Sequence, residues 1–129
     1  MIGYITIGAN DLDQARSFYS TLLGTIGAKE LMRMDNGFTM YGTDWGQPAI
    51  CVTNPYDGNP ASVGNGAMAA LVMKDRGTVD AMHAKALELG GSDEGAPGLR
   101  GEEGPQAFYG AYFRDPEGNK LCAFAIGPA

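Results

Sequence analysis

The chain has 129 residues, of which 44% are hydrophobic, so it is long enough and apolar enough to bury the core of one domain. Nine Lys and Arg against fifteen Asp and Glu give a formal net charge of −6. The absence of a basic run makes nucleic acid and anionic membranes poor partners. Because the sequence has no secretory leader, no long apolar stretch and only two cysteines, we expect a cytoplasmic protein.

The first part of the chain predicts one helix among strands. Alternating residues at 3–8 indicate a strand. Asp11 is placed to cap a helix whose apolar residues from Leu12 to Leu23 fall on one stripe, and the glycines of segment 24–27 end it. Three further strands are predicted at residues 28–34, 38–42 and 49–53, the first two joined by a turn at 35–37.

A second set of the same elements follows a linker at residues 54–65. A short apolar strand is predicted at 67–73, then a helix capped by Asp75 and ended by Gly90 and Gly91. The remaining strands are predicted at 92–95, 107–113 and 120–124. The first of these is weak and leads through Pro97 into a glycine-rich loop, and a turn at 115–118 joins the other two.

The two sets are related by an offset of 64 residues, which indicates an internal repeat. The offset pairs Asp11 with Asp75, Ala15 with Val79, Phe18 with Met82, Tyr19 with His83, Leu22 with Ala86, Leu23 with Leu87 and Gly27 with Gly91. One βαβββ unit cannot easily bury both its helix and its sheet. We therefore predict an α+β fold in which modules 1–53 and 66–127 form a single domain over residues 1–129, with an open barrel-like sheet. The concave surface of that sheet is the expected pocket.

Three sets of residues give the chain a family resemblance: Ile5 to Gly8, Asn10 to Leu12 with Ser17 to Tyr19 and the Gly27 stop, and the run from Tyr112 to Asn119 that contains Asp-Pro-Glu-Gly. On these segments the chain resembles the vicinal oxygen chelate superfamily, which includes glyoxalase I, the bleomycin-resistance proteins and the extradiol dioxygenases. Residues 95–100 and 109–112 further resemble a glyoxalase-like branch of small members. The resemblance implies a homodimer and, if the protein is an enzyme, a lyase or a dioxygenase.

Metal-dependent relatives take their ligands from four strands, and the resemblance places the corresponding positions at Tyr4, Cys51, Met68 and Cys122. None of these carries the family's histidine, glutamine or glutamate. Divalent ions such as Mg²⁺, Fe²⁺ and Zn²⁺ prefer carboxylate, imidazole or thiolate ligands, and the only histidine, His83, falls on the second helix. We therefore expect no metal and no other cofactor, and we assign no catalytic residue.

Strand alternation predicts which side chains line the pocket, because every second residue of a strand shares a face. The predicted pocket residues are Tyr4, Thr6, Cys51, Thr53, Met68, Cys122 and Phe124, with Tyr109 from an aromatic cluster and Trp45 on a polar loop at the rim. The thiols and Met68 have three alternative roles: a soft-metal site, a redox pair of cysteines, or filler of an apolar interior. The last is the commonest role of such residues.

The predicted function is metal-independent binding of a small organic ligand in an aromatic and Met-lined pocket. The alternative is a glyoxalase-I-like (lactoylglutathione lyase-like) or dioxygenase-like metal enzyme with displaced ligands. A third possibility is a structural or regulatory subunit with neither metal nor pocket. Arg100 has two alternative roles. It is either a clamp for an anionic substrate or an arginine that is solvated or paired with Glu102 or Glu103.

Overall fold

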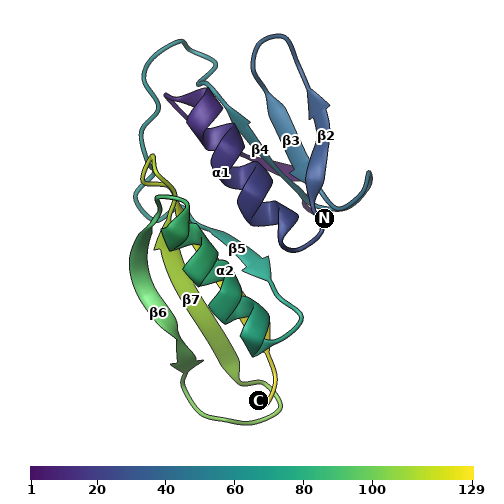
Figure 1. Ribbon diagram of the computed structural model, residues 1–129, viewed down its shortest axis with the longest axis vertical. Helices are drawn as coiled ribbons and strands as arrows, with labels where there is room; N and C mark the ends of the chain where they lie inside the picture. Colours follow the sequence, from purple (N-terminus) through teal and green to yellow (C-terminus); the bar gives the residue numbers. More distant parts are fainter. The chain divides into compact units, whose positions relative to one another are not determined.

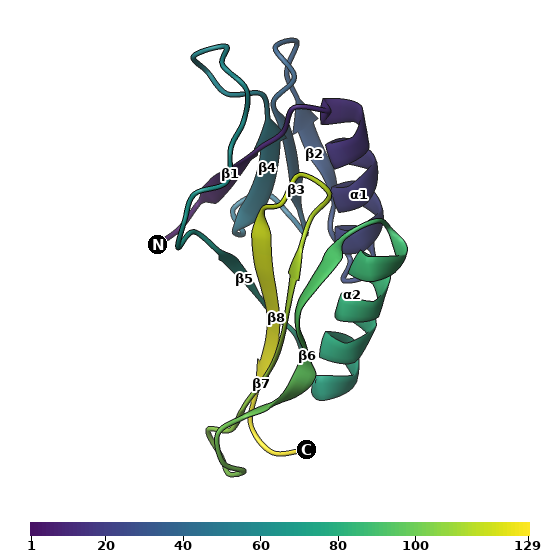
Figure 2. The same cartoon turned by 90° about the vertical axis from the view of Figure 1, so that its left-hand side faces the viewer.

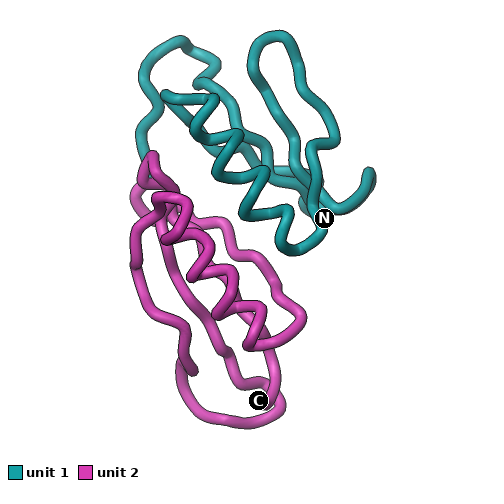
Figure 3. The backbone as a smooth tube through the Cα atoms, viewed as in Figure 1, with its two compact units in different colours: residues 1–64 teal, residues 65–129 magenta.

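The computed structural model describes residues 1–129 as two compact units, Met1–Gly64 (unit 1) and Asn65–Ala129 (unit 2), coloured separately in Figure 3. Unit 1 contains β1 (Tyr4–Gly8), α1 (Leu12–Gly24), β2 (Lys29–Arg33), β3 (Thr39–Gly42) and β4 (Ala49–Thr53). Unit 2 contains β5 (Ala69–Val72), α2 (Arg76–Glu88), β6 (Ser92–Arg100), β7 (Phe108–Arg114) and β8 (Lys120–Ile126). The fold class is α+β, as predicted. Neither helix has the length and apolar character needed to cross a bilayer.

Each unit forms its own open four-stranded sheet, and the two sheets have the same topology (Figure 1). The strand order is β1-β4-β3-β2 in unit 1 and β5-β8-β7-β6 in unit 2. The first strand of each unit runs parallel to the last, whereas the other neighbours are antiparallel. The 64-residue repeat in the sequence therefore corresponds to two βαβββ units of identical connectivity.

Both helices begin at the predicted aspartates. The carboxylate of Asp11 accepts a hydrogen bond of 3.0 Å from the backbone N–H of Gln14, and that of Asp75 accepts one of 2.7 Å from Thr78. Each cap satisfies a backbone donor that the first helical turn leaves without a partner. The two helices thus start at equivalent points of the repeat.

In each unit the helix covers one face of the sheet and leaves the other face without a helix (Figure 2). In unit 1, Phe18, Tyr19 and Leu22 of α1 are buried on this covered face, together with Tyr41 and Val52 of the sheet. Burial of these apolar side chains provides the main stabilisation of the unit.

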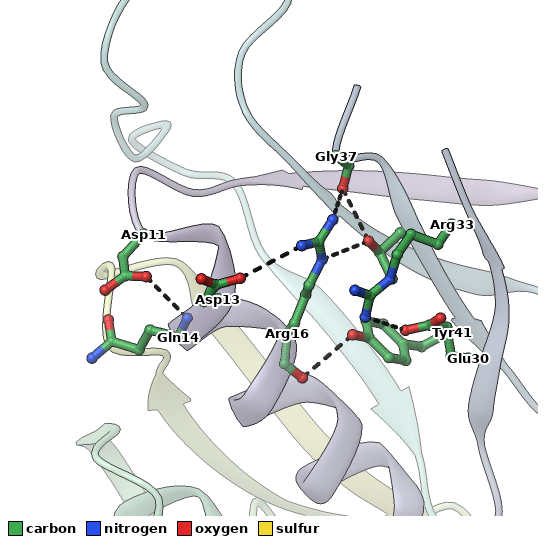
Figure 4. A network of polar contacts seen from close by, with 9 residues as sticks. Asp11, Asp13, Gln14, Arg16, Glu30, Arg33, Gly37 and Tyr41 are labelled. Atoms are coloured by element: carbon green, nitrogen blue, oxygen red, sulfur yellow. Dashed lines mark hydrogen bonds and ion pairs between the residues drawn. The ribbon is translucent and has the colours of Figure 1, made fainter. Parts of the chain in front are cut away.

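A polar network anchors α1 to β3 at the edge of the covered face (Figure 4). Arg16 of α1 donates hydrogen bonds of 2.9 Å to the Thr39 hydroxyl and to the backbone carbonyl of Gly37. The Tyr41 hydroxyl donates in return to the backbone carbonyl of Arg16 at 3.3 Å. Because these partners lie on both elements, the network fixes the register of the helix on the sheet.

Unit 2 buries its helix in the same way but includes the single histidine. His83 lies on the side of α2 that faces the sheet and is only 7% exposed. Its ring is edge-on to Phe113 at a centroid distance of 6.4 Å. A hydrogen bond of 2.9 Å joins its Nε2 to the carboxylate of Asp93 at the start of β6. The histidine therefore links helix to sheet at the position that Tyr19 occupies in unit 1.

One predicted element was too short. The sequence indicated a strand at 92–95 followed by a loop, whereas β6 continues through Pro97 to Arg100. The strand tolerates a proline and glycines because it lies at the edge of its sheet and its pairing with β7 shifts register twice, between Asp93 and Gly95 and between Gly95 and Gly98. Bulges of this kind accommodate residues that would break a central strand.

Candidate functional site

The face of each sheet that carries no helix, here called its open face, is built from alternate residues of the strands. In unit 1, direct pairing of β1 with β4 sets Thr6 opposite Cys51, Tyr4 opposite Ala49 and Gly8 opposite Thr53. Paired residues project to the same side of a sheet, so the strand register brings Tyr4, Thr6, Cys51 and Thr53 to one face. Their intervening neighbours Ile50 and Val52 are buried on the covered face.

An aromatic pair occupies the open face of unit 1. Tyr4 is 53% exposed and meets Phe38 edge-on, with ring centroids 5.7 Å apart. Such an arrangement sets the positive edge of one ring against the negative face of the other. Trp45, 61% exposed, lies on the loop between β3 and β4. The Thr53 hydroxyl donates locally, to the backbone carbonyl of Asn54 at 3.0 Å.

Cys51 is fully buried, although it belongs to the open face. Its register neighbours are Thr6 on β1 and Met40 on β3, and its exposed fraction is 0%. Burial raises the pKa of the Cys51 thiol to about 11, because the charged thiolate is poorly solvated there. At neutral pH the side chain is therefore an uncharged thiol of low reactivity.

In unit 2 the open face is centred on Cys122 of β8. Cys122 lies opposite Ala70 of β5 and Tyr112 of β7, and Phe124 lies opposite Val72 and Gly110. Burial raises the pKa of the Cys122 thiol as well, while a hydrogen bond from Tyr112 and the charges of Arg100 and Lys120 act in the opposite direction. Met68 comes directly before β5 and is 45% exposed.

Two phenylalanines form a stacked pair on this face. The rings of Phe108 and Phe124 are nearly parallel, at an angle of 8° and a centroid distance of 5.2 Å. Gly110 makes the stack possible, because a Cβ at that position would lie 2.6 Å from Phe108 Cε1. Phe124 is one of the predicted pocket residues, whereas Phe108 was not predicted.

Two cationic side chains contact the ring of Tyr112 beside the stack. Arg100 Cζ and Lys120 Nζ each lie 5.4 Å from its centroid, within the range of a cation–π interaction. Sequence reasoning did not place Lys120 at the site. Strand alternation could have placed it there, because Lys120, Cys122 and Phe124 are spaced two residues apart on one strand and share a face.

Tyr109 lies on the other side of the sheet from Cys122 and Phe124. Its hydroxyl donates a hydrogen bond of 2.7 Å to the Asp80 carboxylate of α2, and the guanidinium of Arg76 covers its ring at 5.1 Å. The odd-numbered residues of β7 face the helix, whereas Phe108 and Tyr112 face the open side. Tyr109 is therefore part of the helix–sheet contact and does not share the open face with Cys122 and Phe124.

The residues at the four positions that correspond to family metal ligands do not fit a divalent ion. They offer a phenol at Tyr4, a thioether at Met68 and two thiols whose pKa burial raises, at Cys51 and Cys122. Hard and borderline divalent ions bind mainly through carboxylate or imidazole donors, and none of these four side chains supplies one. Within either unit, no three His, Cys, Asp or Glu side chains converge to replace them.

The chain belongs to the Glyoxalase/Bleomycin resistance protein/Dioxygenase superfamily, whose family model matches residues 1–123. A glyoxalase/bleomycin resistance protein from Albidiferax ferrireducens is 33% identical, with a TM-score of 0.84 over 97% of this chain and 98% of that one. A glyoxalase/bleomycin resistance protein/dioxygenase family enzyme from Burkholderia phytofirmans is 19% identical, with a TM-score of 0.72 over 96% and 97%.

A lactoylglutathione lyase from Agrobacterium tumefaciens is 20% identical, with a TM-score of 0.67 over 97% of this chain and 92% of that one. At such identities the second and third likenesses show the fold alone. No curated protein matches the sequence.

Proposed function

We propose that the chain binds a small organic molecule, without a metal ion, on the open faces of its two sheets. The observation that supports this best is the contrast between the two faces of each sheet. The covered faces are closed by helices, whereas the open faces present large apolar side chains to solvent, among them Tyr4, Met68 and Val72. Exposed apolar surface of this kind usually marks a binding site.

The chemistry of the open faces suits a ligand of mixed polarity. Aromatic rings at Tyr4 and Phe38 in unit 1 and at Phe108 and Phe124 in unit 2 supply flat apolar contact. The exposed hydroxyls of Tyr4 and Thr6 supply a few polar contacts. Pockets for organic ligands typically combine a mainly apolar lining with few polar groups. The proposed ligand-binding residues are Tyr4, Thr6, Trp45, Cys51 and Thr53 on the open face of unit 1, and Met68, Cys122 and Phe124 on that of unit 2.

The second candidate is a metal-dependent lyase like the lactoylglutathione lyase of Agrobacterium tumefaciens. The shared fold with that protein supports this alternative. The donor set at Tyr4, Cys51, Met68 and Cys122 speaks against it, so a lyase reaction would need a different set of ligands. We also propose, from membership of the family alone, that the protein is a homodimer, which sedimentation analysis would test.

The two candidates differ in their need for a metal. In the presence of EDTA, the full chain should bind members of a set of small aromatic compounds, detected by saturation-transfer NMR, and the bound compounds should shift amide signals of β1, β5 and β8. Binding that appears only after addition of Ni²⁺ or Zn²⁺ would favour the lyase. If no compound binds with or without metal, the proposal is wrong, and the chain is better explained as a structural or regulatory subunit.

A further inference from the structure

The open face of unit 2 carries positive charge as well as aromatic rings. Register sets Arg100 opposite Phe108, and Lys120 opposite Arg114, on the side of the sheet that also carries Tyr112. Arg114 is neutralised, since its Nε donates to the Glu94 carboxylate at 2.6 Å. Arg100 and Lys120 make no ion pair, and both contact the ring of Tyr112. Two uncompensated cations thus share one ring in a chain whose net charge is −6.

The guanidinium of Arg100 is held in place by its own strand. It donates hydrogen bonds of 2.8 Å to the carbonyl of Ala96 and 2.9 Å to that of Gly98. Gly95 and Gly98 leave the space it occupies, because a Cβ at these positions would lie 3.3 and 3.1 Å from its nitrogens. A cation fixed in this way loses little conformational entropy when an anion binds.

The charged and aromatic parts of this face are adjacent. Tyr112 lies opposite Cys122, and Gly110, which carries the Phe108–Phe124 stack, lies opposite Phe124. These positions are two residues apart along β7 and β8, a distance of about 7 Å. A planar molecule of two fused rings with one acidic substituent spans such a distance.

We propose that the open face of unit 2 recognises an aromatic carboxylate, with its ring system against the Phe108–Phe124 stack and its carboxylate between Arg100 and Lys120. This inference rests on the proposed function, because it specifies the charge and shape of the ligand that the open faces bind. The carboxylate supplies the anionic partner that Arg100 and Lys120 do not have within the chain. Charge-assisted hydrogen bonds to it are stronger than neutral ones. The cation–π contacts with Tyr112 hold the two cations on this face.

The test compares two compounds that differ only in charge, naphthalene-2-carboxylate and naphthalene-2-carboxamide, by titration calorimetry on the full chain in EDTA. The carboxylate should bind at least about tenfold more tightly at low salt, because it makes charge-assisted contacts with two cations. The difference should shrink as salt is added. Lys120→Met and Arg100→Met should each weaken carboxylate binding about tenfold and leave carboxamide binding unchanged.

Two control variants isolate the effect of position. Lys74→Met removes an exposed lysine in the bend after β5 that is not one of the two cations on Tyr112, and it should change neither affinity. Lys120→Arg keeps the charge and should retain the preference for the carboxylate. Circular dichroism and the thermal midpoint establish that each variant is folded.

The outcomes separate this inference from the function on which it rests. Equal binding of the carboxylate and the carboxamide would overturn the charge recognition and leave ligand binding intact. The same follows if Lys74→Met weakens the carboxylate as much as Lys120→Met. If neither compound binds, the inference fails, and the proposed function fails with it only if the wider set of aromatic compounds is also not bound.

Discussion

Cys122 and Tyr112 lie directly opposite each other on the antiparallel strands β8 and β7. Cys122, which the family resemblance aligns with a metal-ligating glutamate, is therefore a buried thiol beside an aromatic ring. That ring in turn carries Arg100 and Lys120. The positive charges of Arg100 and Lys120 oppose the binding of a metal cation at this position.

The first prediction concerns the reactivity of Cys51. Because its pKa is about 11 and its side chain is fully buried, Cys51 should react with 5,5′-dithiobis(2-nitrobenzoate) at pH 8 far more slowly than a free thiol. The measurement is the rate of thiol release with and without denaturant, in wild type and in Cys51→Ala. Rapid modification of Cys51 in the folded protein would show that the thiol is accessible and ionised.

The same pKa predicts how stability depends on pH. The pKa of Cys51 rises from its ordinary 9.0 to about 11 on folding, so its contribution to stability is complete below about pH 9 and is lost as the pH rises toward 11. The free energy of unfolding should therefore fall more steeply over this range in wild type than in Cys51→Ala. Parallel curves for the two proteins would contradict the assigned shift.

The second prediction concerns Met68 and the proposed ligand site. Met68→Trp adds bulk at an exposed position and should weaken binding of small aromatic compounds at a stability cost of no more than about 1–3 kcal/mol. Leu87→Trp, at an exposed position of α2, is the matched control and should leave binding unchanged. Equal affinities in Met68→Trp and wild type, measured by calorimetry, would remove Met68 from the site.

Cys122→Trp tests the same site from β8. Cys122 is buried, so a tryptophan there should both weaken binding and destabilise the fold. Its thermal midpoint has to be measured beside its affinity, and the affinity is compared only where the variant remains folded.

The third prediction concerns the ion pair between Arg76 and Glu103, which ties the loop after β6 to the start of α2. Two hydrogen bonds of 2.9 and 2.6 Å join the side chains, and Arg76 holds the pKa of Glu103 below its ordinary 4.5. The contribution of this pair is present above pH 4.5 and is lost as the pH falls through the folded pKa. Glu103→Gln should be less stable than wild type in urea at pH 7, and the difference should shrink as the pH falls below 4.5.

The fourth prediction concerns the core of unit 1. Leu22 of α1 is fully buried. Leu22→Ala should therefore lower the free energy of unfolding by about 2–5 kcal/mol, the cost of lost burial plus a cavity. Thr21→Ala, one residue earlier and exposed, serves as the control. If equilibrium unfolding shows the same stability for both variants, the assigned covered face of α1 is wrong.

Most of the fold could be predicted from sequence because its signals are local. Asp11 and Asp75 cap helices, the turn at residues 35–37 joins two strands, and period-two alternation marks β1. The end of β6 could not be predicted in this way, because Pro97 and its glycines are tolerated only through the irregular pairing with β7. On either side of Pro97 the partners lie far along the chain, because Gly98 pairs with Gly110 and Gly95 with Tyr112.

The candidate site was predictable only in part, because local pattern specifies a face but not the path of a long side chain. Alternation correctly placed Thr6 with Tyr4 and Phe124 with Cys122 on common faces. The grouping of Tyr109 with them followed from its aromatic character instead of its parity. The Arg100 side chain can lie over Tyr112 because Gly95 and Gly98 have no Cβ atom. No periodic pattern in the sequence reveals this contact.

The most direct test of the central claim is the metal content of the full chain, measured by plasma mass spectrometry after dialysis against Ni²⁺, Zn²⁺, Fe²⁺, Mn²⁺ and Mg²⁺ and removal of unbound ions. The donor set at Tyr4, Cys51, Met68 and Cys122 predicts well below one ion of any kind per chain. About one ion per chain, lost in Tyr4→Phe or Cys122→Ala, would contradict metal-independent binding and favour the lyase.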